Sequence, residues 1–311
     1  MSDAGVIEAA GRLLGEHARR DEPLGPRTTY RVGGRAALLV EVDREADLDA
    51  VREAVTATGV EVLVVGKGSN LLVADAGFPG LAISLGEGFA QVDIDGTRVT
   101  AGGAAALPVV ARRTVRAGLT GFEWAVGVPG SIGGAVRMNA GGHGSDMAAS
   151  LVGVRVVDLR TGEDGEVSAS ALELGYRSSA VAPHHLVVSA DLALAEGDPE
   201  AGARVLAEIV AWRRANQPGG PNAGSVFTNP EGDSAGRLID AAGLKGCRVG
   251  TAAVSEKHAN FIQADEGGRA DDVRALMSLV VERVEAVTGV TLHAETRCVG
   301  FDDNPRPEVE G

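Results

Sequence analysis

The chain has 311 residues, of which 44% are hydrophobic but only 3% aromatic, so its core must consist mainly of aliphatic side chains. A chain of this length is expected to form two or three compact units. The net charge of −14 argues against a nucleic-acid partner, because contact with a phosphate backbone needs a basic surface. Two cysteines without metal-ligand spacing, and no apolar segment of signal-peptide or membrane-spanning length, predict a cytoplasmic protein without membrane contact.

The first part of the chain alternates between helical and strand patterns. Residues 6–19 predict a peripheral helix, and the apolar run over 36–42 predicts a buried strand. Asp43 is expected to cap a helix that continues to Gly59, and a second buried strand follows over 62–65. This strand–helix–strand order indicates a βαβ unit.

The remaining elements continue this mixed order. Residues 82–99 predict strands that turn at Asp95 and Gly96, and Gly118 is expected to end the helix that follows. Pro218 stops a long amphipathic helix, and we place a domain boundary there. The expected helices cover 107–117, 199–216, 235–242 and 273–287, and the expected strands cover 152–156, 186–194 and 291–299. The apolar face of the 199–216 helix is formed by Val205, Ile209 and Trp212.

Two glycine-rich segments carry the strongest chemical signal. Residues 127–144 contain seven glycines with interleaved apolar side chains, which distinguishes this segment from a flexible linker. Residues 66–73 match neither the dinucleotide fingerprint, which needs glycine at Leu71, nor the P-loop. Both segments are typical of loops whose main-chain N–H groups hold phosphate. Two such loops favour a dinucleotide such as FAD, and Lys67 is either a phosphate ligand or a solvated surface charge.

Three side chains elsewhere are candidates for chemistry. Arg177 either offers a planar fork for a carboxylate or phosphate or is an ordinary surface arginine. Ser225, which does not lie in a Gly-x-Ser-x-Gly motif, is either a turn serine or a positioned proton donor. Glu295 lies in the expected terminal strand and is either paired near Arg297 or functional. The histidines show no metal-ligand spacing, so no metal site is expected.

Taken together, these motifs resemble one family, the UDP-N-acetylenolpyruvoylglucosamine reductases (MurB) of bacterial peptidoglycan synthesis. The matching segments occur in order from about residue 27 to residue 300, which is nearly the whole chain. They are 29–34, 66–73, 124–134, 138–142, 176–179, 223–227, 235–240, 254–261 and the segment around Glu295. The short interval between Tyr176 and the strand at Leu186 resembles the shorter-loop subtype of the family.

The resemblance implies an α+β fold with a non-Rossmann FAD-binding module of two subdomains. This is the class shared with vanillyl-alcohol oxidase, also called PCMH-type, and a C-terminal α+β domain binds the substrate. The implied boundaries are 27–195 for the FAD-binding domain (subdomains about 27–90 and 91–195), 211–302 for the substrate-binding domain, and 1–26 for an N-terminal extension.

The resemblance also implies an activity and a set of site residues. The expected enzyme is an FAD-dependent oxidoreductase that uses NADPH to reduce UDP-N-acetylglucosamine enolpyruvate to UDP-N-acetylmuramate, acting as a monomer or weak dimer. Arg177 corresponds to the active-site arginine of the family, Ser225 to its proton-donating serine and Glu295 to its active-site glutamate. The expected FAD contacts are Gly66, Lys67, Gly68, Ser69, Asn70, Pro129, Gly130, Ser131, Gly133, Gly134, Asn139 and Gly141.

Two departures and two alternatives accompany this interpretation. Thr228 stands where the family commonly has Lys or Arg, and 263–267 replaces its usual Asn-containing turn, which affects secondary substrate contacts. The first alternative is a flavin oxidase of the same FAD-binding class, with His143 as the residue in the main glycine segment that could tether the flavin. The second is an inactive UDP-sugar-binding or scaffold protein, which the presence of all three catalytic residues disfavours.

Overall fold

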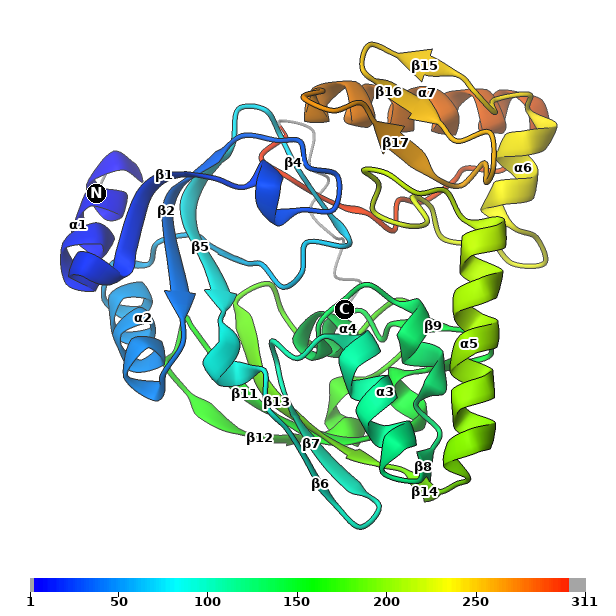
Figure 1. The fold of residues 1–311 in the computed structure, drawn as a ribbon. Helices are drawn as coiled ribbons and strands as arrows, with labels where there is room; N and C mark the ends of the chain where they lie inside the picture. The colour runs from blue at the N-terminus through cyan, green and yellow to red at the C-terminus, as the bar shows by residue number, and fades with distance from the viewer. Residues whose placement is uncertain (1–2, 302–311) are drawn as a thin grey trace. The chain divides into compact units, whose positions relative to one another are not determined.

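The computed structural model describes residues 3–301, which form two compact units (Figure 1). One unit contains the chain before Asp21 together with Leu38–Lys67 and Gly80–Ala215. The other contains Asp21–Ala37, Gly68–Pro79 and the chain from Asn216 onwards. Each unit therefore combines segments that are distant in sequence. The domain boundaries expected from the sequence stay predictions.

A four-stranded sheet contributes to the first unit, with the strand order β1-β2-β5-β3. Its strands are Ala18–Pro23, Arg35–Val42, Phe78–Leu85 and Val62–Val64, and β3 runs parallel to β5. Helices α1 (Asp3–Leu14) and α2 (Glu45–Thr58) pack against each other beside this sheet (Figure 1). Their aliphatic side chains, such as Leu14, Val51 and Leu38, form one buried core.

Two expected helix ends in this region are wrong. The first helix ends at Leu14 rather than continuing to residue 19, because Gly15 adopts a left-handed backbone with φ of +55° and a strand follows. The expected N-cap Asp43 is one residue early: Arg44 is the N-cap of α2. The start of α2 is instead satisfied by Asp47, whose Oδ2 accepts the backbone N–H groups of Asp43 and Arg44. At the other end, Gly59 closes α2 as expected, with φ of +66°.

A second, antiparallel sheet forms the larger core of the first unit, in the order β12-β11-β13-β7-β6. Its strands are Asp164–Ser168, Leu151–Asp158, His185–Ala193, Arg98–Gly102 and Val92–Asp95. Helices α3 (Leu107–Arg116) and α4 (Ile132–Arg137) pack onto it (Figure 1). The expected turn at Asp95–Gly96 and the glycine after α3 at Gly118, with φ of +77°, are confirmed. Short pairs complete the unit: β8 (Leu119–Thr120) with β14 (Ala195–Glu196), and β9 (Gly141–Gly142) with β10 (Ser145–Asp146).

Helix α5 (Pro199–Asn216) has the expected bounds but buries less of its apolar face than the sequence suggests. Gly202 lies close to Val115 of α3, and Ile209 lies close to Gly127. Val205 and Trp212 remain 40% and 49% exposed, so the predicted apolar face is buried only in part. The reason is that the helix contacts its unit along a narrow line of small and medium side chains.

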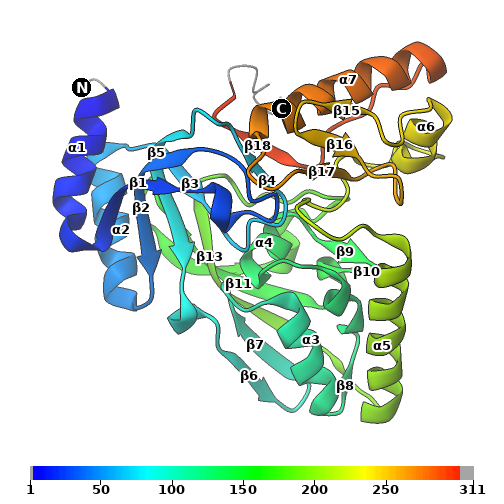
Figure 2. The same cartoon turned by 45° about the horizontal axis from the view of Figure 1, so that its top comes forward.

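The second unit is built around a three-stranded antiparallel sheet, β15-β16-β17 (Arg248–Val249, Ala252–Val254 and Ile262–Ala264). Helix α7 (Ala270–Thr288) lies along this sheet, and α6 (Ala235–Ala241) packs against α7 (Figure 2). Their buried residues include Val273, Leu276 and Val280, as the helical spacing predicts. Within the described residues, no helix is both long and apolar enough to cross a membrane.

The predicted terminal strand is largely absent. Strand β18 covers only Arg297–Val299 and pairs in parallel with β4 (Leu71–Val73), so Glu295 precedes the strand rather than lying in it. The chain before β18 pairs elsewhere: Ala294 forms a bridge with Phe227, and Thr228 N–H donates to the carbonyl of His293 at 2.9 Å. Tertiary pairing with another loop thus replaces the regular strand that the alternation predicted.

Candidate active site

A glycine-lined pocket lies within the first unit. Its walls come from the end of β3, the loop before α4, α4 itself and the start of β13. Several side chains give it an apolar surface, and Lys67 and Arg137 add positive charge. The lining residues are Val64, Val65, Gly66, Lys67, Leu85, Gly103, Ala104, Ser131, Gly133, Gly134, Arg137, Val181, His185, Leu186 and Val187.

Two glycines of this pocket leave no room for a Cβ atom. A Cβ at Gly103 would overlap the carbonyl oxygen of Val187, and one at Gly66 would lie 2.6 Å from Ser131 Oγ. Ser131 is the N-cap of α4, and its Oγ accepts the N–H of Gly134 at 3.4 Å. The pocket therefore exposes backbone where other residues would place side chains.

The structure brings together five of the predicted FAD contacts in this pocket, namely Gly66, Lys67, Ser131, Gly133 and Gly134. Gly68, Ser69 and Asn70 belong to the second unit. The other predicted contacts, which do not line the pocket, are Pro129, Gly130, Asn139 and Gly141. Sequence reasoning missed Arg137 and His185, although Arg137 follows the glycine segment directly and His185 begins a buried strand.

Asn139 and Gly141 instead support the loop that carries Arg177. Asn139 is buried; its Nδ2 donates to the carbonyl of Gly175 at 2.8 Å and its Oδ1 accepts Ala148 N–H at 2.9 Å. Gly141 offers its carbonyl to Nη2 of Arg177 at 3.1 Å. The glycine segment therefore fixes both the backbone before Arg177 and its guanidinium.

Arg177 adopts a left-handed backbone with φ of +56°, which is uncommon for a residue with a side chain. Its guanidinium also lies 5.3 Å from the ring centre of Tyr176, which is 62% exposed. A strained conformation that neighbouring bonds maintain is typical of functional sites. The sequence left Arg177 open between a ligand for a carboxylate or phosphate and a surface arginine, and its half-buried position agrees better with the first.

In the second unit, the segments of Ser225 and Glu295 are bonded to each other. The carbonyl of Val226, the residue after Ser225, accepts the N–H of Glu295 at 2.8 Å and that of Thr296 at 3.2 Å. Both Ser225 and Glu295 are half-buried. Two of the three predicted catalytic residues are therefore neighbours through their backbones, although about 70 residues separate them in sequence.

Two asparagines hold this pair of segments. Asn70 Nδ2 donates to the carbonyl of Glu295 at 3.0 Å. The buried Asn260 bonds both backbone groups of Phe227, and its own carbonyl accepts Val226 N–H at 2.9 Å. The side chain of Asn260 therefore has a structural role, because both of its polar atoms bond the backbone of Phe227.

Ser225 also borders a polar hollow of about 460 Å³ in the second unit. The other lining residues are Asn229, Ser234, Gly236, Arg237, Asp240, Lys245, Lys257, His258, Ala259 and Asn260. Arg237 pairs with Asp233, and Lys245 pairs with Asp240 at 2.6 Å. Burial lowers the pKa of His258, which favours its neutral form near pH 7. Three cationic side chains against the two carboxylates of these pairs leave the hollow with a small excess of positive charge, which suits an anion.

Ser234 lies in a hydrolase-like sequence motif that sequence reasoning missed. Gly232–Gly236 reads Gly-x-Ser-x-Gly, the pattern of a nucleophile elbow. However, no strand leads into it, and Ser234 is the N-cap of α6, with its Oγ accepting Arg237 N–H at 3.3 Å. A capping serine without a strand-to-helix elbow does not provide a nucleophile.

Two domain models match the chain. The FAD binding domain matches residues 36–167, and the C-terminal domain of UDP-N-acetylenolpyruvoylglucosamine reductase matches residues 216–299. The UDP-N-acetylenolpyruvoylglucosamine reductase of Heliobacterium modesticaldum is 45% identical over 287 residues, which cover 90% of each chain. The chain belongs to the UDP-N-acetylenolpyruvoylglucosamine reductase family.

Other members of this reductase family agree with the assignment. The reductase of Paramagnetospirillum magneticum is 45% identical over 286 residues, covering 90% of this chain and 91% of its own. The crystal structure of the reductase (MurB) from Thermus caldophilus superposes with a TM-score of 0.78 at 38% identity, covering 89% of this chain and 97% of that one. The expected α+β fold, with its non-Rossmann FAD-binding module, is confirmed, and the chain is an FAD-dependent oxidoreductase.

The pocket of the first unit fits FAD in its donor set. Its glycines leave backbone accessible to a diphosphate, and Lys67 and Arg137 supply opposite charge. Its aliphatic residues, including Leu85 and Val181, suit the apolar faces of aromatic rings. Residues 66–73 do not match the GxGxxG fingerprint of Rossmann folds. This agrees with a pocket that is built from two separate loops rather than from one Rossmann turn.

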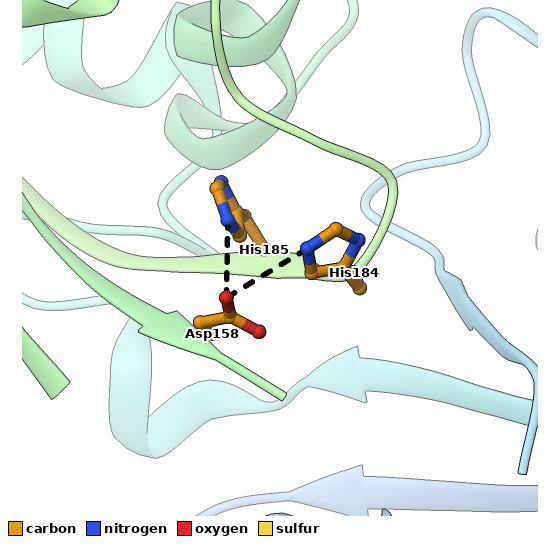
Figure 3. A group of neighbouring side chains, drawn as sticks. All are labelled: Asp158, His184 and His185. Atoms are coloured by element: carbon orange, nitrogen blue, oxygen red, sulfur yellow. Dashed lines mark ion pairs between the residues drawn. The ribbon is translucent and has the colours of Figure 1, made fainter. Parts of the chain in front are cut away.

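Asp158, His184 and His185 form the one group among residues 3–301 whose side chains could share a cation (Figure 3). His184 Nε2 and His185 Nε2 lie 3.7 and 3.6 Å from Asp158 Oδ2. However, His185 Nδ1 accepts the N–H of Ala182 at 3.1 Å, so the proton of a neutral ring is on Nε2, the atom a metal would need. Burial and the charge of Arg160 lower the pKa of His184, which favours its neutral form and weakens its ion pair with Asp158. The geometry favours a hydrogen-bonded strand end over a metal centre.

Proposed function

We propose that the chain uses NADPH and FAD to reduce UDP-N-acetylglucosamine enolpyruvate to UDP-N-acetylmuramate, the reaction of UDP-N-acetylmuramate dehydrogenase in peptidoglycan precursor synthesis. The observation that carries the proposal is the bonded pair of segments bearing Ser225 and Glu295 at the edge of a cationic hollow. A proton donor beside an anion site is what reduction of an enolpyruvyl UDP-sugar needs.

FAD is proposed to lie in the glycine-lined pocket of the first unit. Gly66, Ser131 and Gly133 form the wall for its diphosphate, and Lys67 and Arg137 offset the phosphate charge. When bound, FAD supplies the hydride for the reduction, with NADPH as the source. The chain contributes binding and orientation, and its apolar walls exclude water from the rings.

Arg177 is proposed to bind the carboxylate of the enolpyruvyl group. Negative charge develops across this carboxylate and the adjacent carbon during reduction, so a preorganised guanidinium stabilises the transition state more than the ground state. The bonds from Asn139 and Gly141 that fix the Arg177 loop reduce the reorganisation needed. A well-placed donor of this kind contributes on the order of 3 kcal/mol.

Ser225 is proposed to hold the proton that the product gains at C2, and Glu295 to stabilise the same developing charge by hydrogen bonding. A serine hydroxyl is a weak acid, so transfer from its Oγ requires a strongly basic carbon and tight positioning. The backbone bonds of Val226 to Asn260 and Glu295 supply that positioning.

The UDP part of the substrate is proposed to occupy the hollow beside Ser225. Because the whole chain carries a net charge of −14, an anionic substrate needs a local cluster of cations. Arg237, Lys245 and Lys257 provide it. Free cysteines at 247 and 298 agree with a cytoplasmic location, and we propose action there as a monomer or weak dimer.

The Ser225→Ala variant tests the function directly. Rapid mixing should show that reduction of the flavin by NADPH stays within about twofold of the parent, whereas reoxidation of the flavin by the enolpyruvyl substrate falls by at least about a hundredfold. Ser278→Ala, on the exposed face of α7, is the matched control and should change neither step. Equal loss in both steps would make Ser225 structural.

A second measurement separates the reductase from a flavin oxidase. We expect the flavin to be released when the protein is denatured, and NADPH consumption to depend on the enolpyruvyl substrate. Flavin that stays attached to His143 after denaturation would contradict the proposal, as would a purified protein that takes up no flavin.

A further inference from the structure

Asn70 lies at the end of the Gly66–Asn70 loop, immediately before β4. Its side chain and its backbone both contact the segment that carries Glu295. The Nδ2 group of Asn70 donates to the carbonyl of Glu295 at 3.0 Å, and the N–H of Arg297 donates to the carbonyl of Asn70 at 3.2 Å. The parallel pairing of β4 with β18 begins at the next residue, where Leu71 faces Arg297. The side chain of Asn70 therefore adds one hydrogen bond just before the point where the two strands begin to pair.

This extension matters because no regular strand holds Glu295. Strand β18 begins only at Arg297, two residues later. The backbone N–H of Glu295 is bonded to Val226, the neighbour of Ser225, and its carbonyl is bonded to Asn70. The first bond connects Glu295 to the residue that follows the proposed proton donor, and the second helps to fix the orientation of the peptide group after Glu295.

We propose that Asn70 is a positioning residue for Glu295, acting through the carbonyl of that residue rather than through contact with FAD. The proposal rests on the catalytic role of Glu295 given above. Without the Asn70 amide, the peptide group after Glu295 keeps the 3.2 Å bond from Thr296 N–H to the carbonyl of Val226 but loses the bond at its carbonyl end. It can then tilt, and the carboxyl group samples orientations away from the developing charge. Loss of a hydrogen bond of this kind is expected to slow the step by up to about tenfold, which corresponds to about 1.4 kcal/mol.

The test is a double-mutant cycle between Asn70→Ala and Glu295→Gln. Flavin content, reduction of the flavin by NADPH, and its reoxidation by the enolpyruvyl substrate are measured for each protein. We expect Asn70→Ala to slow reoxidation by roughly tenfold while flavin content and flavin reduction stay within about twofold. In the Glu295→Gln background, Asn70→Ala should produce no further loss, because the group that it positions has already been changed.

Two additional variants separate positioning from loss of stability. Asn70→Asp keeps the size of the side chain but turns a carboxylate oxygen toward the carbonyl of Glu295, so reoxidation should slow at least as much as in Asn70→Ala. Thr251→Val removes side-chain bonds to Asp272 and Arg269 in the same unit without touching Asn70 or Glu295. It should lower the melting temperature and leave reoxidation unchanged.

The outcomes are distinguishable. If Asn70→Ala slows reoxidation equally in both backgrounds, the inference is overturned and Asn70 is merely structural. If Asn70→Ala lowers the flavin content, the inference is also overturned, and Asn70 contributes to FAD binding instead. Normal reoxidation in Glu295→Gln would overturn the role of Glu295 and the inference with it, while leaving the reductase activity established. If the parent protein shows no substrate-dependent NADPH oxidation, the proposed function itself fails before any variant is made.

Discussion

The side-chain amide of Asn260 bonds both backbone groups of Phe227: Oδ1 accepts the N–H at 3.0 Å, and Nδ2 donates to the carbonyl at 2.8 Å. Asn260 is only 3% exposed, so neither bond can be replaced by water without rearrangement. The backbone carbonyl of Asn260 also accepts Val226 N–H. Asn260 therefore holds the two residues after Ser225 by three hydrogen bonds. The amide acts as a substitute for a neighbouring strand.

We therefore expect Asn260→Ala to lower the free energy of unfolding by about 2 kcal/mol, because it leaves a buried donor and a buried acceptor unpaired. Urea denaturation of the FAD-loaded protein measures the change. Asn222→Ala, whose side-chain bonds to Gly219 and Gly220 are exposed, should cost less than about 1 kcal/mol. Equal effects of the two variants would contradict the role given to Asn260.

The glycine wall of the first unit predicts a strong effect of one added methyl group. Gly103→Ala places a Cβ against the carbonyl of Val187, which is backbone and cannot move aside easily. We expect a lower melting temperature and weaker flavin retention on gel filtration. Gly165→Ala, at an exposed site in β12 with no atom within 4 Å of the added Cβ, should change neither.

Two lysines should have separate effects on the two pockets. Lys257→Met removes a cation from the hollow beside Ser225 and is expected to raise KM for the UDP-sugar by about tenfold, with flavin reduction unchanged. Lys67→Met removes a cation from the glycine-lined pocket and should weaken FAD binding instead. Both measurements are best made at low salt, since exposed charges are screened at high ionic strength. A Lys257 variant with unchanged KM would place the UDP group elsewhere.

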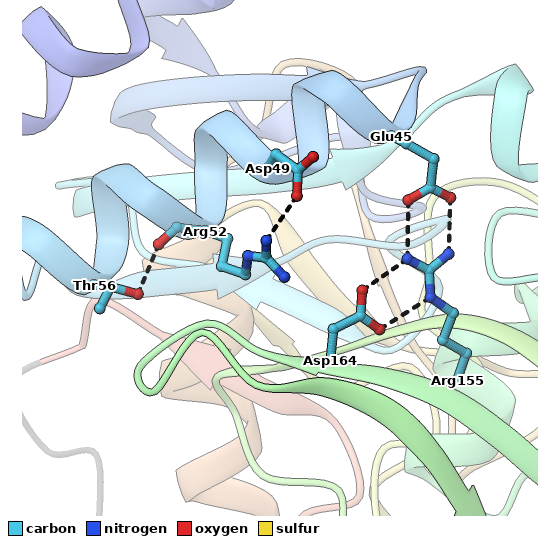
Figure 4. Close-up of polar contacts among 6 residues, drawn as sticks. All are labelled: Glu45, Asp49, Arg52, Thr56, Arg155 and Asp164. Carbon is cyan, nitrogen blue, oxygen red and sulfur yellow. Dashed lines mark hydrogen bonds and ion pairs between the residues drawn. The ribbon is translucent and has the colours of Figure 1, made fainter.

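Arg155 joins helix α2 to the β11–β12 hairpin through bidentate bonds to Glu45 and Asp164 (Figure 4). These hydrogen bonds lower the pKa of both carboxyl groups. A lowered pKa stabilises the fold above the unfolded-state value of about 4, and this contribution is lost as the pH falls through the lower folded-state value.

We expect Arg155→Met to reduce the free energy of unfolding by about 1 kcal/mol at pH 7, since Glu45 is 60% exposed and the pair is partly screened. The difference from the parent should shrink between about pH 4 and pH 2, where the carboxyl groups become protonated. Arg52→Met removes the exposed Asp49 bond shown in the same view and serves as the control, with a smaller effect. A difference that stays constant down to pH 2 would contradict the account.

The sequence predicts the glycine pocket well because local signals are sufficient there. Glycine clusters after strands, together with interleaved apolar residues, identify Gly66, Ser131 and Gly133 without knowledge of the fold. The sequence could not show which groups the side chains of Asn70 and Asn139 bond, and their contacts with FAD stay predictions. Both lie in glycine-rich motifs, yet each side chain bonds a backbone group that is distant in sequence. Asn70 bonds the carbonyl of Glu295, and Asn139 bonds the carbonyl of Gly175.

The sequence by itself therefore determined the family and the cofactor class, because residue types and motif order carry that information along the chain. The catalytic roles of Arg177, Ser225 and Glu295 stay predictions. The tertiary structure alone decided which groups hold these residues in place. In the folded chain the final strand covers only Arg297–Val299, and Trp212 on α5 is half exposed. The physical reason is that a hydrogen bond between residues 70 and 295, or the burial of one helix face, depends on which segments the folded chain brings together, and periodicity does not encode that pairing.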